Sequence, residues 1–257
     1  MVPQASLGCI VQPDWIARQP GLAEGGDISA LGGCCPYETT GLVSRSFGIE
    51  VNRSRLDGTG SAERISPEGV EGQFSYQVSP DARWAIATYQ NAVTPDRISL
   101  ISLPAHRETR LLEDNGELKA RYDALGLNGK EFFRIDIGEV ELDAWMIKPV
   151  DFDPNKKYPL FMFQYSGPGS QQVANRWHGS RDYWHQLLAS RGYIIACVDG
   201  RGTGLKGRDF KKVTQLELGK YEVEDQIELC DFIKTITKSV RDSVEQWVGK
   251  RKKVDIF

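Results

Sequence analysis

A tyrosine stands where an apolar stretch runs into a glycine-rich turn. Residues 158–165, YPLFMFQY, are followed by SGPGSQ, which predicts a buried strand ending in a tight turn with Tyr165 at its lip. A phenol is neutral at pH 7, so it can donate a hydrogen bond to an oxyanion without acting as a base. Two interpretations stay open: Tyr165 is a packed aromatic with an ordinary partner, or it is an electrophilic donor in acyl transfer.

Acyl transfer needs a nucleophile, and the sequence offers none. The strained elbow of an α/β-hydrolase carries its serine in a G-x-S-x-G pattern, which no serine or cysteine of the chain matches. Ser166 and Ser170, the serines of the turn, lack the flanking glycine pair. The histidines, at positions 106, 178 and 185, all precede residue 190, whereas the hydrolase triad ends on a histidine. The sequence therefore contains half of a catalytic machinery.

A second glycine-rich loop ends the next apolar stretch. Residues 193–200, YIIACVDG, lead into Asp199–Gly204, which read DGRGTG. Functional residues of open α/β sheets collect at the carboxyl ends of strands, where both loops are expected. Neither loop has the spacing of a dinucleotide fingerprint or a phosphate loop, so we predict no cofactor.

Cysteine spacing and overall charge argue against several classes of function. The five cysteines fit no zinc pattern, and the adjacent Cys34 and Cys35 suit neither a metal clamp nor an easy disulfide, so we predict no metal site. A net charge of −3 gives no electrostatic reason to expect nucleic acid or an anionic membrane as a partner. No apolar run approaches the roughly 20 residues of a membrane span. No signal peptide is recognisable, and the compartment stays unknown.

The predicted elements divide the chain into regions of different character. Residues 1–46 show no periodicity. Short strands at 74–78, 84–90, 98–104 and 108–114, with turn residues between them, are typical of an antiparallel meander in a sandwich or propeller blade. A short helix at 117–126 and a hairpin, 131–137 with 140–149, lead into strands and helices that alternate. That alternation indicates an α/β sheet with right-handed crossovers.

Two helices of the second half are predicted from their apolar spacing. In the helix that ends at Gly192, Tyr183, Trp184, Leu187 and Leu188 share a face. In the later helix, Val223, Ile227, Cys230 and Ile233 recur at helical spacing. The tail, TKSVRDSVEQWVGKRKKVDIF, is compatible with an extension of that later helix.

Several stretches resemble one family, in that family's order. FFRIDIGEVELDAWMIKPVDFDPNKKYPLFMFQYSGPGSQQV is similar to the entrance of the hydrolase domain of dipeptidyl peptidase IV-like serine peptidases, in the prolyl oligopeptidase group. YIIACVDGRGTGLKGRDF and LGKYEVEDQIE resemble the next two landmarks. Upstream, RLDGTGSAERISPEG, FSYQVSPDARWAIATYQNAVTP and ISLISLP resemble the last part of the family's β-propeller.

The resemblance implies a β-propeller over an α/β-hydrolase domain, and release of N-terminal dipeptides with proline or alanine in second position. It implies that Tyr165, in the family's Y-x-G-P-x-S segment, is an oxyanion donor. Asp199–Gly204 match the family's D-G-R-G-x-G loop, which we interpret as structural. There Arg201 is available for a local ion pair, with direct substrate binding as the alternative. Glu222, Glu224 and Asp225 match an acidic helix start, also interpreted as structural.

Departures from the family pattern set the predicted domains. Residues 1–46 are unassigned, 47–114 are the last propeller blade region, 115–236 are the N-terminal half of the hydrolase domain, and 237–257 are a basic tail that does not match. The fold class is therefore an incomplete α/β-hydrolase sheet preceded by a partial propeller. We predict a truncated, inactive piece of a dipeptidyl peptidase that lacks the serine, aspartate and histidine.

Other expectations also follow from the resemblance. The substrate is a peptide with penultimate proline or alanine, a homodimer is expected of some members, and the compartment is periplasmic, secreted or cell-surface. The alternative function, from a different class, is a non-catalytic α/β module that binds peptides.

Overall fold

The chain falls into two compact units, Met1–Gly116 and Glu117–Phe257, in a computed structural model. The structure describes residues 37–39, 47–55, 61–167, 170–237, 240–248 and 252–256. The prediction for residues 1–46 therefore lies almost wholly outside the described residues. Within the described part, no helix is long and apolar enough to cross a bilayer.

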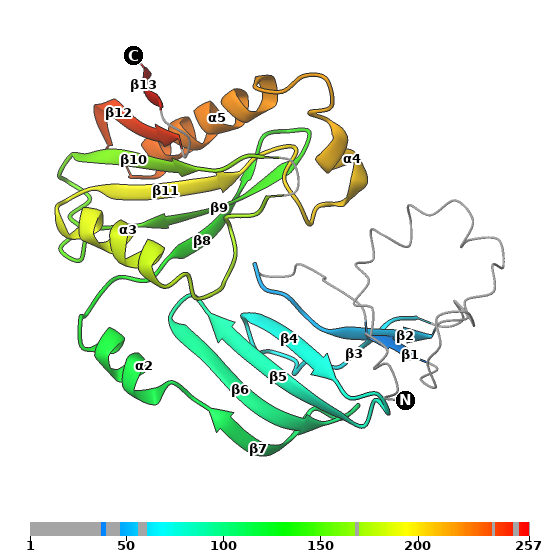
Figure 1. Cartoon of the computed structure of the whole chain (residues 1–257). Helices are drawn as coiled ribbons and strands as arrows, with labels where there is room; N and C mark the ends of the chain where they lie inside the picture. The colour runs from blue at the N-terminus through cyan, green and yellow to red at the C-terminus, as the bar shows by residue number, and fades with distance from the viewer. Residues whose placement is uncertain are drawn as a thin grey trace. The chain divides into compact units, whose positions relative to one another are not determined.

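The first unit contains a four-stranded antiparallel meander (Figure 1). Its strands, in sheet order, are β4 (Gln73–Val78), β5 (Trp84–Asn91), β6 (Thr94–Ser102) and β7 (Arg107–Glu113). Strand β6 begins earlier than the predicted residue 98, because a short turn leads from Asn91 directly to its partner Thr94. A smaller sheet pairs β1 (Tyr37–Thr39), β2 (Asn52–Arg55) and β3 (Glu63–Arg64).

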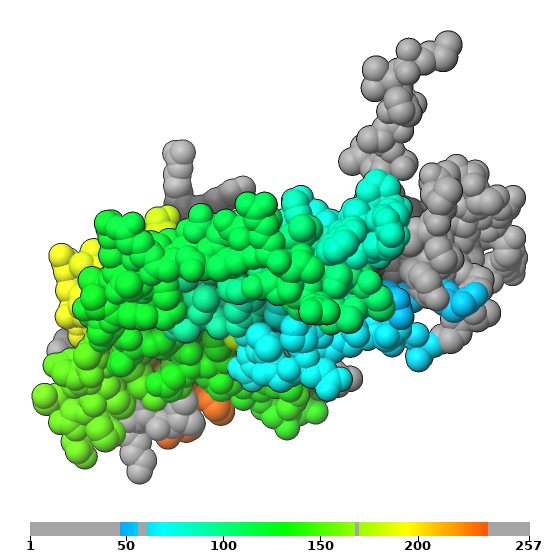
Figure 2. Space-filling model, turned by 90° about the horizontal axis from the view of Figure 1, so that it is seen from below, coloured from blue at the N-terminus to red at the C-terminus, as the bar shows by residue number. Residues whose placement is uncertain are grey.

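Strict alternation builds the core of the meander. In β4, Phe74 and Tyr76 are buried and Ser75 and Gln77 are exposed, as the period of two in a strand requires. The buried cluster on that face is Ile65, Phe74, Tyr76, Ala85, Ala87 and Ile101. The outer strand β7 is exposed along its whole length, and Figure 2 shows this stretch, in green, at the surface.

The second unit is a six-stranded mixed sheet with helices on both faces. Its elements are α2 (Gly116–Asp123), β8 (Glu131–Asp136), β9 (Glu141–Ile147), β10 (Tyr158–Gln164), α3 (Ser180–Ser190), β11 (Ile194–Asp199), α4 (Gly207–Lys212), α5 (Lys220–Thr237), β12 (Val240–Val248) and β13 (Lys252–Ile256). The sheet order is β13-β12-β10-β11-β9-β8. Strands β12, β10 and β11 are parallel, and the others pair antiparallel.

Strand β11 is buried at every position, and β10 is buried or partly buried throughout, as continuous apolar runs predict. One face packs against Leu229 and Ile233 of α5 in a cluster that includes Leu160, Met162 and Ala196. The other face carries Trp145 and Phe163, whose rings lie against His185 of α3 at centroid distances of 5.3 and 5.0 Å. Figure 1 accordingly shows α3 and α5 on opposite sides of the sheet.

The apolar face of α3 that the sequence shows lies largely at the surface. Tyr183, Trp184 and Leu187 are 38%, 54% and 44% exposed. The buried side chains are instead Asp182, His185, Gln186 and Ala189. The reason is that Asp182 and Gln186 have polar partners on the buried side of the helix. Asp182 pairs with the buried ammonium group of Lys130 at 2.8 Å, and the Gln186 amide donates to the Asn128 carbonyl at 2.7 Å.

The apolar face that the spacing predicts for the later helix, α5, is buried only at its C-terminal end. Ile233 is buried, but Val223 and Ile227 are 54% and 46% exposed. The helix is rotated at its start because Asp225, with no exposed side-chain surface, turns inward to bind Arg201. An ion pair therefore outweighs two apolar side chains in setting how this end of the helix lies.

The tail forms strands, not an extension of α5. Strand β12 adds in parallel to β10, with Leu160 opposite Val244 and Met162 opposite Gln246. Strand β13 then pairs antiparallel with β12. An uncovered β10 would present a row of unpaired backbone groups, so pairing with β12 satisfies an edge that helix extension would leave open.

Truncating a side chain that faces α5 should reveal how tightly this layer is packed. Leu160→Ala is expected to lower the free energy of unfolding by about 2–5 kcal/mol, because it opens a cavity in a core position. Leu160 has no exposed surface. Urea denaturation followed by tryptophan fluorescence measures the loss.

Leu187→Ala is the matched control on α3, where the side chain is 44% exposed. Its expected change is within about 0.5 kcal/mol. Similar losses for the two leucines would contradict the described orientation of α3.

Candidate functional site

Both glycine-rich loops lie at the carboxyl edge of the parallel strands. Strands β10 and β11 are neighbours, with Leu160 opposite Ile194 and Met162 opposite Ala196. The loop from Tyr165 follows the first strand, and the loop from Gly200 follows the second. This edge is where open α/β sheets place their functional groups.

Tyr165 is accessible at this edge. The residue is 51% exposed, so its phenol is not enclosed in packed hydrocarbon. Its ring lies above Gly167, where an added Cβ would sit 3.6 Å from the Cε1 atom of the ring. The phenol is therefore free to meet a ligand that approaches the strand ends.

Ser170 joins the tyrosine turn to the glycine loop. Its backbone N–H donates to the Gly167 carbonyl at 2.9 Å, and its hydroxyl donates to the Tyr165 carbonyl at 2.6 Å. Its own carbonyl accepts the N–H of Gly204 at 2.9 Å. One residue thus bonds to Tyr165, to Gly167 and to the neighbouring loop.

Asp199 makes a second connection between the loops. Its carboxylate, in a residue only 4% exposed, accepts the backbone N–H groups of Gln172 at 2.9 and 3.0 Å and of Val173 at 2.8 Å. Burial raises the pKa of Asp199 to about 6, in part offset by these two N–H donors, and the nearby Asp143 carboxylate also favours the protonated form. The carboxylate is held by backbone dipoles instead of a cation bonded to it.

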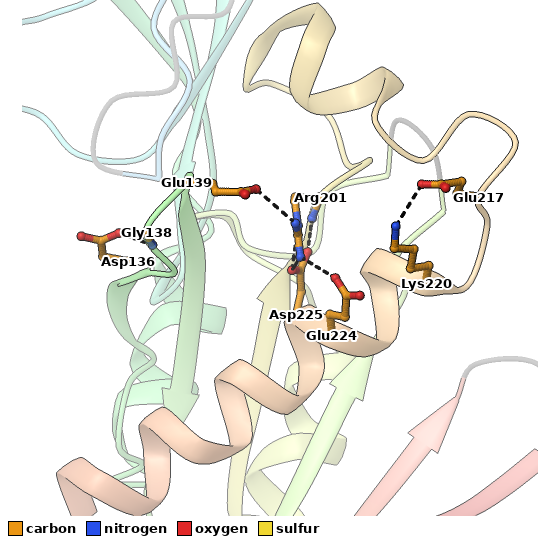
Figure 3. A network of polar contacts seen from close by, with 8 residues as sticks. All are labelled: Asp136, Gly138, Glu139, Arg201, Glu217, Lys220, Glu224 and Asp225. Carbon is orange, nitrogen blue, oxygen red and sulfur yellow. Dashed lines mark hydrogen bonds and ion pairs between the residues drawn. The ribbon is translucent and has the colours of Figure 1, made fainter.

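Arg201 is fully engaged in an ion-pair network with α5 (Figure 3). Its Nε and Nη2 atoms donate to Oδ1 of Asp225 at 3.0 and 2.8 Å, and its backbone N–H donates to Oδ2 at 2.5 Å. Nη2 also reaches Glu224 at 3.1 Å, while Nη1 lies 3.8 Å from Glu139 in the turn between β8 and β9. The guanidinium group stacks over the Tyr221 ring at 4.4 Å from its centroid.

Steric crowding explains why two positions of the D-G-R-G-T-G loop are glycine. A Cβ at Gly200 would approach Oδ2 of Asp225 to 2.8 Å, so a side chain there would disturb the ion pair. Gly202 has a φ of +96°, a left-handed conformation that glycine adopts without strain, and a Cβ there would lie 2.6 Å from the Thr214 methyl group. The loop is compact because backbone and side chains approach closely at both glycines.

The structure therefore brings most of the sequence-predicted residues to one edge. Tyr165, Asp199 and Arg201 lie on the two adjacent loops, and Glu224 and Asp225 bind Arg201. Glu222 caps the start of α5 by accepting the Gly219 N–H at 2.8 Å. Among the described residues, no three histidine, cysteine, aspartate or glutamate side chains gather as metal ligands.

The sequence does not reveal the roles of Asp199 and Ser170. In it, Asp199 is only the first residue of a glycine-rich loop, and Ser170 is only a serine that fails the nucleophile pattern. No local sequence pattern predicts that the Asp199 carboxylate will accept N–H groups of residues 26 and 27 positions away. A signal for Ser170 was its place five residues after Tyr165, within reach of the same turn.

Comparisons with known proteins agree on one family. Residues 180–242 match the model of the prolyl oligopeptidase family. A Podospora anserina protein described as "Probable dipeptidyl-aminopeptidase B" is 37% identical over 189 residues, which cover 72% of this chain and 20% of the relative. The crystal structure of Porphyromonas gingivalis dipeptidyl peptidase 4 superposes with a TM-score of 0.70 at 34% identity, over 83% of this chain and 32% of that one.

The residues that match the family model lie in the α/β unit of the chain. The chain belongs to the prolyl oligopeptidase family and resembles its dipeptidyl peptidase 4-like members. It spans about one fifth of the length of the curated relatives that it matches.

Removing the guanidinium group should expose the cost of an unpaired buried carboxylate. Arg201→Met is expected to lower the free energy of unfolding by about 3–5 kcal/mol, since Asp225 would keep its charge without its partner. Arg201→Lys should lose less stability than Arg201→Met but more than the parent, because the ammonium group keeps the charge but cannot donate from two nitrogens at once. Thermal and urea denaturation measure these losses.

Arg208→Met, at an exposed position of α4, is the matched control, with an expected change within about 0.5 kcal/mol. If Arg201→Met is as mild as Arg208→Met, the network of Figure 3 contributes nothing to stability.

The raised pKa of Asp199 predicts a pH-dependent stability. The folded state keeps its proton up to about pH 6, whereas the unfolded state releases it near the ordinary pKa of 3.8. Folding therefore takes up a proton between these values, and the free energy of unfolding contributed by this group falls as the pH rises through that window.

The measurement compares the chain with Asp199→Asn, which cannot titrate. From pH 4 to pH 7 the parent should lose about 2–3 kcal/mol relative to the variant, which follows from a shift of about two pKa units. Parallel pH profiles of the two proteins would show that Asp199 has an ordinary pKa.

Proposed function

We propose that this chain represents part of a dipeptidyl peptidase 4-like serine peptidase. In this proposal, residues 47–114 are the last blade region of a β-propeller, and residues 115–236 are the N-terminal half of the α/β-hydrolase domain. The four-stranded meander and the mixed sheet that follows it support this division. The substrates are peptides with proline or alanine in the second position, as the family resemblance implies.

The proposed role of Tyr165 is that of an oxyanion donor. When a serine hydroxyl attacks the scissile carbonyl, the carbonyl oxygen gains negative charge, and a phenol O–H within hydrogen-bond reach stabilises it. The observation that carries this role is the accessible tyrosine, 51% exposed, at the carboxyl end of β10, where its carbonyl accepts the Ser170 hydroxyl. A donor fixed before the reaction costs no reorganisation when the charge develops.

The proposed role of Arg201 is structural. Its guanidinium group already has two carboxylate partners within 3.1 Å and an aromatic ring over one face. Direct contact with substrate would require it to leave the fully buried Asp225. That exchange would leave an uncompensated charge in the interior, which is costly.

The chain by itself is proposed to be inactive. Its sequence contains no serine in a G-x-S-x-G pattern and no histidine after residue 185. An oxyanion donor without the attacking group leaves the slow step of acyl transfer without its nucleophile. We expect no turnover of Gly-Pro or Ala-Pro p-nitroanilides by the purified chain, and turnover that a serine-directed phosphonate blocks would contradict this.

A chimera tests the role of Tyr165 directly. The matching 189 residues of the Podospora anserina relative are replaced by those of this chain. The chimera should release p-nitroaniline from Gly-Pro p-nitroanilide, and Tyr165→Phe should lower kcat by about 10²–10³-fold with little change in KM, as expected for a lost oxyanion donor.

Tyr183→Phe, which removes the hydroxyl of an exposed tyrosine on α3, is the matched control and should leave kcat unchanged. A Tyr165→Phe chimera that keeps its full kcat would refute the proposed role. A folded chimera that is inactive with Tyr165 in place would count against the assignment of this chain to the peptidase domain.

A further inference from the structure

We infer that Ser170 is a positioning residue for Tyr165, and that the glycine loop holds Ser170 in place. The inference rests on the proposed role of Tyr165 and adds the residue that aims its phenol. It concerns geometry that the chain itself contains, so its test needs no nucleophile.

The first step is the hydrogen bond beneath the ring of Tyr165. The ring of Tyr165 lies over Gly167, and the carbonyl of Gly167 accepts the N–H of Ser170 at 2.9 Å. This bond ties Gly167 to Ser170. The position of Gly167, against which the ring lies, is therefore coupled to the position of Ser170.

The second step is the peptide plane that follows Tyr165. The Ser170 hydroxyl donates to the Tyr165 carbonyl at 2.6 Å, which restrains the rotation of that peptide group. Rotation about the Cα–C bond of Tyr165 would swing this carbonyl away from the hydroxyl. The hydrogen bond thereby limits the direction in which the side chain leaves the strand end.

The third step is the anchor of Ser170 itself. Its carbonyl accepts the Gly204 N–H at 2.9 Å, and Gly204 ends the loop that begins at Asp199. Two residues further along, the N–H of Gln172 donates to the Asp199 carboxylate. Ser170 and Gln172 are thus both bonded to this one loop, which Asp225 holds through Arg201.

The nearby Ser166 makes a different contact and serves as a comparison for Ser170. Its Oγ accepts the side-chain amide of Gln164 at 2.8 Å, a bond between side chains at the strand end. That bond touches neither the carbonyl of Tyr165 nor the glycine loop. Ser166→Ala is therefore a matched control for Ser170→Ala.

The test is fluorine NMR of the full chain labelled with 3-fluorotyrosine. The chain has nine tyrosines, and Tyr165→Phe identifies the resonance of Tyr165 by its loss. In Ser170→Ala this resonance should narrow and move to the position of free fluorotyrosine, while the other resonances and the unfolding midpoint stay in place. Ser170→Thr, which keeps the hydroxyl, should restore the parent position, and Ser166→Ala should leave it unchanged.

An unmoved Tyr165 resonance in Ser170→Ala would overturn the inference, and so would an equal shift in Ser166→Ala. If Ser170→Ala lowers the unfolding midpoint and moves all resonances together, Ser170 is a general structural residue and the inference is also overturned. None of these outcomes depends on the kcat measured for the Tyr165→Phe chimera. The failure of the inference and the failure of the proposed function are therefore distinguishable.

Discussion

The buried carboxylate of Asp199 connects the strands of the second unit to the loops at their ends. It terminates β11 and accepts N–H groups from Gln172 and Val173, which follow the neighbouring strand. Backbone N–H groups inside a protein need partners, and here a single side chain serves two of them. Without it, the N–H groups of Gln172 and Val173 would need other acceptors.

The ion pair of Arg201 and Asp225 extends this connection to α5. The Asp225 carboxylate binds both the side chain and the backbone N–H of Arg201, so it fixes the loop and not just a charge. Gly200 lets the carboxylate come so near, because any Cβ there would collide with it. The loop, the helix start and the strand end therefore form one unit, and Tyr165 is attached to it through Ser170.

Buried polar partners also explain why the two long helices present unexpected faces. Lys130 binds Asp182 beneath α3, and Arg201 binds Asp225 beneath the start of α5. A buried charge without a partner costs several kcal/mol, of the same order as exposing two or three apolar side chains. The helices are therefore oriented by their carboxylates, and Trp184, Leu187, Val223 and Ile227 are left at the surface.

The sequence by itself determined the order of the elements and the place of Tyr165. Alternating or continuous apolar runs between glycine and proline turns depend on neighbours in the chain, so the strands from 74 to 199 and the glycine-rich loops could be read directly. The peptidase resemblance came from such local motifs as well. Tertiary structure alone decided the faces of α3 and α5, the strand formation of the tail and the contacts of Asp199 and Ser170. These features depend on groups far apart in sequence, whose hydrogen bonds and charges override local periodicity once water is excluded.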